Sequence, residues 1–477
     1  MLAFRKDGTR PLSHAQRRHW LFAGVLALLL LSGLHAFNVE KHVLAIDGEP
    51  EGFQANLARA FLDGDLDLGP APEQLVVLAD PWDPDANRSI RYEFALHDYA
   101  FYEGRIHSPF GPTPALLLHL PIRALTGEPI HPATSTLIWS IGLVLASFAT
   151  YRIVTRSLMT TRPWWGDAAA LAAIGLAGPV LWLISIGRGY EESIACGAFL
   201  LMAGTAILAR FVTNPGSTPS ALLAIAGLVL GLAAGARPHL LAAGLLVIAA
   251  AVSIIRSRRP GYRVAVAALA FPYGAAVLAL LAYNQARFGT PMEFGTAYQM
   301  AGMDLREYPL FDPAHLLPNL RDYLVGGPRF EARWPHIHLL ENTFDNDPSR
   351  HTNEPVAGML TTFPAIAVGL RCIPLAFRSA GRNNRGLKCA VLAVFTLACG
   401  LLAAISLPFS SSTMRYTVDF VPMFALLATI SAVLVFGAAT ANEDHRGLRR
   451  VWVAALVWSS YAGLMLPLTP CPGTGSC

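Results

Sequence analysis

Apolar stretches of about 20 residues recur along the chain, and they restrict its fold more than any other feature. A helix needs about 20 consecutive apolar residues to cross the hydrocarbon core of a bilayer. About eleven stretches approach this length, at 19–37, 133–151, 165–186, 192–209, 220–236, 239–255, 264–284, 357–376, 389–407, 417–436 and 451–468. The chain has 53% hydrophobic and only 14% charged residues, and this composition excludes an ordinary soluble enzyme. The sequence predicts an all-α polytopic membrane helix bundle of about 11 transmembrane helices, in a single membrane domain over residues 1–477.

The basic residues are distributed unevenly between the two sides of this predicted bundle. If the N-terminus is inside, the short inner segments contain more than half of the 36 Lys and Arg residues, including Arg152, Arg156 and Arg162, and few of the 32 acidic residues. Short cytoplasmic loops of membrane proteins carry such an excess of Lys and Arg. We therefore expect a cytoplasmic N-terminus, with the acidic residues mainly on the outer side.

Two outer segments, residues 38–132 and 285–356, are too long to be turns. Both are rich in Pro, Trp, Tyr, His and carboxylate residues. Loops of this length usually bind ligands or catalyse reactions unless they are disordered, and the aromatic content argues against disorder. The sequence therefore predicts two large outer loops with a functional role.

The first outer loop contains two segments with the pattern of short interfacial helices. In 51–68, apolar residues from Phe53 to Phe61 recur at helical spacing, and Gly64 ends the pattern. The segment 110–127 is apolar but short, and three prolines interrupt it. Counting it as a span would place the later basic loops outside, against the charge rule. We therefore expect a helix that lies along the outer membrane surface.

The sequence GRGYEES, residues 187–193, places Arg188, Glu191 and Glu192 at the outer turn between two predicted spans. Two interpretations stay open. Acidic residues in the first turn of a helix are favoured by its dipole, so Arg188 could simply pair with one of the two Glu residues. Alternatively, the three groups belong to a functional site.

Charged residues recur at the outer ends of other predicted spans. They are Asp47, Glu49, Glu51, Arg237, His239, Glu354, Arg415 and Asp419. Glu354, which precedes Pro355 at the start of the predicted eighth span, fits helix capping as well as contact with an acceptor. A site for an anionic group needs Arg residues, and a reaction that removes a proton needs a carboxylate. The sequence predicts that these groups share one cleft at the outer helix ends.

The order of these features resembles the GT-C class of polyprenyl-phosphate-sugar glycosyltransferases over nearly the whole chain. Four segments carry the resemblance: DGEPEGFQANLARAFLDGDLDL (47–68), YEGRIHSPFGPTPALLLHLP (102–121), GRGYEESIACGAFLLMAG (187–204) and MRYTVDFVPMFALLA (414–428). A fifth, AYNQARFGTPMEFGTAYQMAG (282–302), is similar to a group of bacterial members.

The resemblance implies that a sugar moves, with inversion, from a polyprenyl-phosphate donor to a glycan, lipid or protein acceptor. The reaction would take place on the periplasmic or exoplasmic face of a bacterial inner (plasma) membrane. In this class an acid of the first outer loop takes the acceptor proton or positions the acceptor, and that role falls on Asp47, with Glu49 and Glu51 as rivals. The second acid would be Glu191 or Glu192.

The remaining charged residues receive secondary roles from the same resemblance. Arg188, Arg237 or Arg415 would stabilise the departing phosphate, while His239 and Glu354 are candidates for contact with the acceptor. A divalent metal ion between Asp47 and the second acid is left open, because some members of the class use one. No other cofactor is implied.

Two other functional classes remain as alternatives. A transporter or flippase of a lipid-linked sugar would also need outer Arg residues and many helices. Transporters often show inverted repeats and broken helices near the membrane midplane, whereas here the charges cluster at outer helix ends, which favours catalysis. A scaffold without activity is the third class. The chain has no P-loop and no G-x-G-x-x-G motif, and nothing in it indicates a nucleic acid partner.

Overall fold

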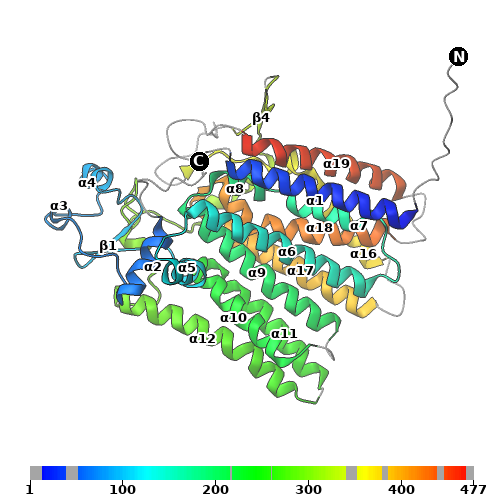
Figure 1. The fold of residues 1–477 in the computed structure, drawn as a ribbon, viewed down its shortest axis with the longest axis horizontal. Helices are drawn as coiled ribbons and strands as arrows, with labels where there is room; N and C mark the ends of the chain where they lie inside the picture. Colours follow the sequence, from blue (N-terminus) through cyan, green and yellow to red (C-terminus); the bar gives the residue numbers. More distant parts are fainter. Residues whose placement is uncertain are drawn as a thin grey trace.

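The protein is a bundle of long helices that run side by side, with smaller elements at one end (Figure 1). The computed structural model describes residues 13–38, 52–214, 218–258, 260–332, 334–339, 352–378, 385–437 and 445–468. Within these ranges the strands are confined to three short two-stranded pairs. The prediction of an all-α bundle is therefore confirmed.

Eight helices in the described part of the chain are long and apolar enough to cross a membrane. They are α1 (His14–Asn38), α6 (Pro132–Leu158), α7 (Gly166–Gly175) with α8 (Val180–Ile186), α9 (Gly189–Thr213), η2 (Pro238–Ala243) with α11 (Gly244–Ser257), α12 (Tyr262–Phe288), α17 (Arg385–Ser406), and α19 (Arg446–Met465) with η8 (Leu466–Leu468). Each corresponds to one of the predicted spans.

The other three predicted spans are shorter or interrupted. The helices α10 (Ser220–Ala236) and α18 (Val421–Phe436) are apolar but shorter than the eight. The segment 357–376 does not form one helix, because the chain bends near Pro364. It forms α14 (Met359–Thr362), α15 (Pro364–Leu370) and α16 (Ile373–Arg378). The total of about 11 crossings therefore stays a prediction.

The apolar core runs through the centre of the bundle. Nearly every residue of α18 is buried, including Leu426 and Val433, and α7 with α8 is almost as deeply enclosed. In contrast, α12 buries few residues, and Phe271 on it is 76% exposed. Apolar side chains that are exposed on long helices suit contact with lipid. A smaller cluster around Leu75, Phe101 and Met300 forms a separate core in the outer loops.

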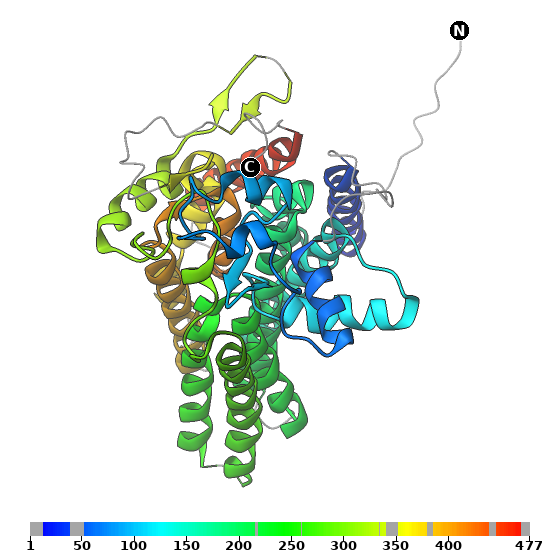
Figure 2. The same ribbon diagram turned by 90° about the vertical axis from the view of Figure 1, so that its left-hand side faces the viewer.

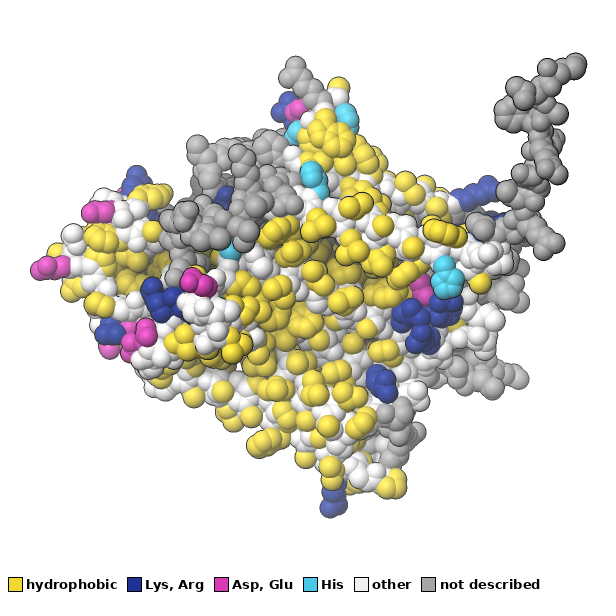
Figure 3. All heavy atoms as spheres, in the orientation of Figure 1, with side chains coloured by type: hydrophobic (Ala, Val, Ile, Leu, Met, Phe, Trp, Pro, Cys, Tyr) yellow, Lys and Arg dark blue, Asp and Glu magenta, His cyan; other side chains and the backbone are white. Residues whose placement is uncertain are grey.

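Charges are grouped at one end of the long helices. Asp167, at the start of α7, is buried and accepts hydrogen bonds from Arg18 and Arg162, each at 2.9 Å, with Arg152 Nη1 3.6 Å away. On the face that Figure 3 draws, basic side chains gather at this end, an apolar band crosses the middle, and acidic side chains lie mainly at the other end. This pattern is consistent with a multi-pass membrane protein.

Both predicted interfacial helices are present in the first outer loop. The first, α2 (Phe53–Asp63), ends at Gly64, whose φ of 86° gives the left-handed conformation that favours glycine. The second consists of a π-helical turn, η1 (Ala115–His119), followed by α5 (Leu120–Thr126). Comparison of Figures 1 and 2 shows that α5 lies across the direction of the long helices.

Short elements complete the outer loops. The first loop adds α3 (Glu73–Val76), α4 (Arg88–Glu93) and the antiparallel strands β1 (Ala100–Tyr102) and β2 (Arg105–His107). The second contains η3 (Thr296–Tyr298), η4 (Pro313–His315), α13 (Leu316–Val325), and the antiparallel strands β3 (Arg329–Phe330) and β4 (Ile337–His338). It ends in β5 (Thr352–Asn353), which pairs in parallel with β6 (Ser411–Ser412) just before η6 (Met414–Asp419).

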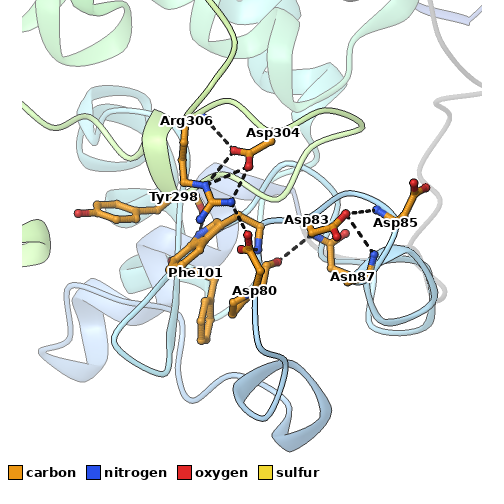
Figure 4. Close-up of polar contacts among 11 residues, drawn as sticks. Asp80, Asp83, Asp85, Asn87, Phe101, Tyr298, Asp304 and Arg306 are labelled. Carbon is orange, nitrogen blue, oxygen red and sulfur yellow. Dashed lines mark hydrogen bonds and ion pairs between the residues drawn. The ribbon is translucent and has the colours of Figure 1, made fainter.

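Direct contacts join the two outer loops (Figure 4). Arg306 of the second loop donates to Asp80 of the first at 2.6 Å and also to Asp304. The indole Nε1 of Trp82 donates to the carbonyl oxygens of Phe101 and Tyr298. The hydrogen bond from Arg306 holds the pKa of Asp80 below its usual value. The loops therefore pack on each other as well as on the bundle.

Candidate functional site

The first turn of α9, residues 189–193 of the GRGYEES sequence, is the point at which several distant segments meet. Each of its five residues contacts a distant part of the chain. Gly189 lies against Phe53 of α2, Tyr190 donates to Asp98, Glu191 faces Arg415 of η6, Glu192 contacts His119 of η1 and Ser135 of α6, and Ser193 accepts from Gln54 of α2. The turn therefore organises the outer end of the bundle.

Glu191 caps the helix and also faces an arginine. Its Oε2 accepts a hydrogen bond from the backbone N–H of Arg188 at 3.0 Å, which satisfies one of the free donors at the helix start. Its Oε1 lies 3.9 Å from Arg415 Nη1. The side chain is fully buried. The cap at the helix start therefore accounts for only one of the two carboxylate oxygens of Glu191.

Arg415 lies between two carboxylates and against an aromatic ring. Its Nη2 donates to Glu354 Oε1 at 2.5 Å, and its guanidinium carbon lies 5.0 Å from the centre of the Tyr190 ring. Burial alone would lower the pKa of Arg415, but the nearby Glu354, Tyr416 and Glu191 raise it above its usual value. Arg415 therefore stays charged within a largely buried site.

The second outer loop fixes the positions of Glu354 and Arg415. The parallel pairing of β5 with β6 continues in a hydrogen bond from the Glu354 N–H to the Ser412 carbonyl oxygen at 2.9 Å. The Ser412 hydroxyl in turn donates to the buried carboxylate of Asp322 on α13 at 2.7 Å. The strands β5 and β6 are thereby held together beside α13, and they position Glu354 and Arg415 next to each other.

A second ion pair lies beside the first. Arg237, which follows α10, donates to Asp419 Oδ2 at 2.8 Å, and His239 Nε2 lies 3.6 Å from Asp419 Oδ1. The ring of Tyr416 separates the two pairs. The guanidinium carbons of Arg237 and Arg415 lie 5.2 and 5.6 Å from its centre. Cations near an aromatic face are attracted to it, so Tyr416 links the two pairs into one cluster.

Several buried polar atoms of this cluster have no hydrogen-bond partner among the residues that the structure describes. They are Glu191 Oε1, Glu354 Oε2, Asp419 Oδ1, Thr413 Oγ1 and Arg237 Nε. Buried polar groups are nearly always hydrogen-bonded to protein, water or ligand. Glu354 Oε2 and Arg237 Nε therefore have hydrogen-bonding capacity left for water or a polar ligand. So do Glu191 Oε1 and Asp419 Oδ1, which lie 3.9 Å from Arg415 Nη1 and 3.6 Å from His239 Nε2 without a hydrogen bond.

An apolar groove of about 520 Å³ lies deeper in the bundle, below the second ion pair. It is lined by α9, η2, α11, α17 and α18, with Leu201, Ala243, Gly400 and Met423 among its residues. A Cβ atom on Gly197 of α9 would lie 3.0 Å from the Arg237 side chain. Leu201 follows Gly197 by one helical turn, about 5.4 Å along the axis. The groove thus begins close to Arg237.

The structure divides the predicted site residues into two groups and leaves a third group outside its description. It brings together Glu191, Glu354, Arg415, Arg237 and His239, with Arg188 at the adjoining helix start. It places Glu192 on a different side of α9, against His119 and Ser135. Asp47, Glu49 and Glu51 lie outside the described residues.

One predicted role is wrong. Glu354 does not begin a helix, because the next helix is α14 and its N-cap is Gly358. Its carboxylate binds Arg415 instead. The sequence reasoning also missed Tyr190, Asp98 and His119. Tyr190 lies inside the GRGYEES sequence, and His119 interrupts the otherwise apolar run 114–122, so the sequence carries a local signal for both residues.

Metal ligation receives no support from the described residues. In the described ranges, no three His, Cys, Asp or Glu side chains are gathered closely enough to hold an ion. The expectation of a divalent ion involved Asp47, which lies outside these ranges, so it stays a prediction.

Comparison with known proteins adds no assignment. No family model, curated protein or solved structure matches this chain.

Proposed function

We propose that the protein is an inverting glycosyltransferase of the GT-C type, which moves a sugar from a polyprenyl-phosphate donor to an acceptor on the outer face of the membrane. One observation carries the proposal: carboxylates and arginines from distant segments form one buried cluster, and an apolar groove between long helices of the bundle begins close to its Arg237. Such a donor combines the same two chemistries, because it has a charged head and a long apolar tail.

The groove supports a prenyl chain as the apolar part of the donor. Its lining on α17 extends from Val394 to Ala404, which corresponds to about 15 Å of helix. The lining is almost entirely aliphatic, and a prenyl chain bound there would meet no polar group that it could leave unsatisfied. The head of such a lipid would lie near Arg237, at the end of the groove closest to the cluster.

Arg237 is the arginine best suited to the donor phosphate. Its Nη2 is engaged by Asp419, but its Nε–H has no hydrogen-bond partner among the described residues. Arg binds phosphate through several N–H groups at once. Arg415 is held by Glu354, and we assign it the role of holding the Glu191 and Glu354 side chains in place.

The carboxylate oxygens of the cluster suit the hydroxyl groups of a sugar. Glu191 Oε1, Glu354 Oε2 and Asp419 Oδ1 are buried acceptors without hydrogen-bond partners in the described part of the chain. A hydroxyl donates to a carboxylate in a short and strong hydrogen bond. We therefore assign these oxygens to the donor sugar and to the attacking hydroxyl of the acceptor.

The reaction would proceed as a single displacement. The acceptor hydroxyl oxygen attacks the anomeric carbon and loses its proton to a carboxylate, which we assign to Asp47. The bond between the anomeric carbon and the phosphate oxygen breaks, and the polyprenyl phosphate leaves as an anion beside Arg237. Proton removal of this kind contributes typically 10²- to 10⁴-fold. Stabilisation of the departing anion in a site that excludes water contributes a similar amount or more.

The same proposal includes the finer topology. We assign eleven crossings, a cytoplasmic N-terminus and a periplasmic site in a bacterial inner membrane. In this arrangement α10, α18 and the broken segment 357–376 also cross the bilayer. Asp47 precedes the described Gly52 by five residues, and a chain of that length spans at most about 18 Å. Gly52 precedes α2, which contacts the first turn of α9.

The test is transfer by the purified protein in lipid nanodiscs. The protein is given a radiolabelled polyprenyl-phosphate sugar together with glycan, lipid and peptide acceptors, and products are separated from the donor. A labelled covalent product that Asp47→Asn abolishes is the expected result. In liposomes, movement of intact donor between leaflets without any product would contradict the proposal and favour a flippase.

A further inference from the structure

Glu192 and His119 form a buried polar contact that the proposed reaction does not use. Glu192 is 0% and His119 1% exposed. His119 Nε2 contacts Glu192 Oε1, and the Ser135 hydroxyl donates to the same oxygen at 2.6 Å. The carboxylate therefore lies within the bundle, and two hydrogen-bonding partners from different elements hold it.

His119 comes from the interfacial segment and not from the bundle. It ends η1 and leads into α5, and both helices expose apolar side chains, since Leu116 of η1 is 42% and Leu125 of α5 86% exposed. A second polar contact lies close by. The N–H of Ala115 donates to Gln54 Oε1, and Gln54 Nε2 donates to Ser193 Oγ, each at 3.1 Å. Adjacent residues of α9 thus bind both interfacial helices.

The two neighbouring acids of α9 point in different directions. Successive residues of a helix are rotated by about 100°, so Glu191 can face Arg415 while Glu192 faces η1 and α6. If His119 were absent, Glu192 would be a buried carboxylate with Ser135 as its main partner. A buried charge without adequate partners is strongly unfavourable, so the first turn of α9 would have to rearrange. Glu191 lies in that turn.

We propose that His119 is a positioning residue, which docks the interfacial segment Ala115–Thr126 on Glu192 and thereby fixes the turn that presents Glu191 to Arg415. The docking is independent of any reaction. Its effect on catalysis rests on the proposed function. The two acids of the sequence then have separate tasks: Glu191 belongs to the polar cluster, and Glu192 holds the surface helix.

Hydrogen exchange tests the docking without any assay of activity. In His119→Ala we expect amide exchange in residues 115–126 to accelerate at least tenfold, with α19 unchanged. Glu192→Gln removes the buried charge, so the double variant His119→Ala/Glu192→Gln should recover much of the lost thermal stability. His315→Ala, which alters another buried histidine, should leave exchange in 115–126 at the wild-type rate. Wild-type exchange in His119→Ala, or a double variant no more stable than His119→Ala, would overturn the docking.

The kinetic test separates positioning from simple folding. In His119→Ala we expect kcat for sugar transfer to fall at least tenfold with little change in the KM for the donor. In His119→Gln the amide can still donate to Glu192, so kcat should be largely restored. Equal losses in both variants, or a loss confined to KM, would overturn the positioning role. If the wild-type protein transfers no sugar, the proposed function fails, while the exchange experiment still decides the docking.

Discussion

Arg415 donates to Glu354 across 2.5 Å, although 61 residues separate them in the chain. The contact depends on the parallel pairing of β5 and β6, which places Glu354 directly beside the start of η6. Arg415 also faces Glu191, so three segments with no local relation in sequence converge on one guanidinium. The properties of the site follow from this convergence.

Arg415 and Glu354 should contribute to the free energy of unfolding in a coupled, non-additive way. Glu354→Ala leaves Arg415 with Glu191 as its remaining close carboxylate, at 3.9 Å, and we expect a loss of about 1 to 3 kcal/mol in the free energy of unfolding. Arg415→Met should cost at least as much, because the buried Glu191 loses its cation. Unfolding of both single variants and the double variant in detergent gives the coupling energy. Strictly additive losses would show that the contact is not formed.

Close backbone contact around the site should make one glycine intolerant of substitution. A Cβ atom on Gly111 would lie 2.1 Å from the backbone oxygen of Gly235. We expect Gly111→Ala to destabilise the protein by about 1 to 3 kcal/mol, because neither backbone can move freely. Gly274→Ala, on α12, meets no atom within 4 Å and should be neutral or stabilising. Thermal unfolding of the two variants checks this, and equal melting temperatures would contradict the packing.

Lowering the pH should destabilise the outer loops, because His107 has a lowered pKa in the folded protein. Burial, together with Arg287, lowers the pKa of His107 from 6.5 to about 4 in the folded protein. Between pH 6.5 and 4 the unfolded loop binds a proton that the folded loop does not, so the free energy of unfolding falls as the pH falls. The total loss is about 3 kcal/mol and is complete near pH 4. In His107→Gln, the part of the pH dependence of the free energy of unfolding that comes from His107 should disappear.

Hydrogen exchange of β1 and β2, corrected for the pH dependence of amide exchange itself, measures the effect of His107. Protection should decrease between pH 7 and pH 4.5 in the wild-type protein and much less in His107→Gln. Asp67 also has a lowered pKa, because its contacts with Arg105 and Gly69, with a smaller effect of His107, outweigh its burial, so most of its contribution is retained in His107→Gln. An identical decrease in the two proteins would assign the acid sensitivity to groups other than His107.

Filling the groove should weaken binding of long-chain donors only. Gly400 lines the groove, and a Cβ atom there would meet nothing within 4 Å. We expect Gly400→Phe to raise the KM for a long prenyl donor at least tenfold, while kcat and the KM for a short-chain donor stay close to wild type. Gly274→Phe adds the same ring elsewhere and should have no effect. Equal KM changes for both donors would exclude the groove as the tail site.

Much of the architecture could be predicted because local patterns carry it. Apolar length alone identified the eight long helices, and the Asp63–Gly64 stop gave the end of α2 correctly. The break at Pro364 was missed, because the apolar composition of 357–376 continues across it. The shortness of α18 was also missed, because the residues before Val421 form a 3₁₀ helix although their composition is partly apolar.

Several charged residues of the cluster could be predicted from the sequence, but their pairings could not. Charge at outer helix ends is visible in the sequence, and it correctly grouped Glu191, Arg237 and Arg415. The partner of Arg415 was not predictable, because short parallel pairing between β5 and β6 leaves no periodic pattern. Nor could the sequence decide which of Glu191 and Glu192 faces Arg415, since that depends on how α9 is rotated against its neighbours.

The most direct measurement compares sugar transfer by Arg237→Ala with transfer by Arg105→Ala, using equal amounts of folded protein in nanodiscs. Arg105 is also an outer-loop arginine paired with an aspartate, at 2.6 Å from Asp67, but it lies in β2 and has no contact with the cluster. Loss of the arginine that stabilises the departing phosphate should lower kcat/KM at least 100-fold, whereas Arg105→Ala should stay within about threefold of wild type. Wild-type kcat/KM in Arg237→Ala, or an equal loss in both variants, would contradict a transfer site at the outer end of this bundle.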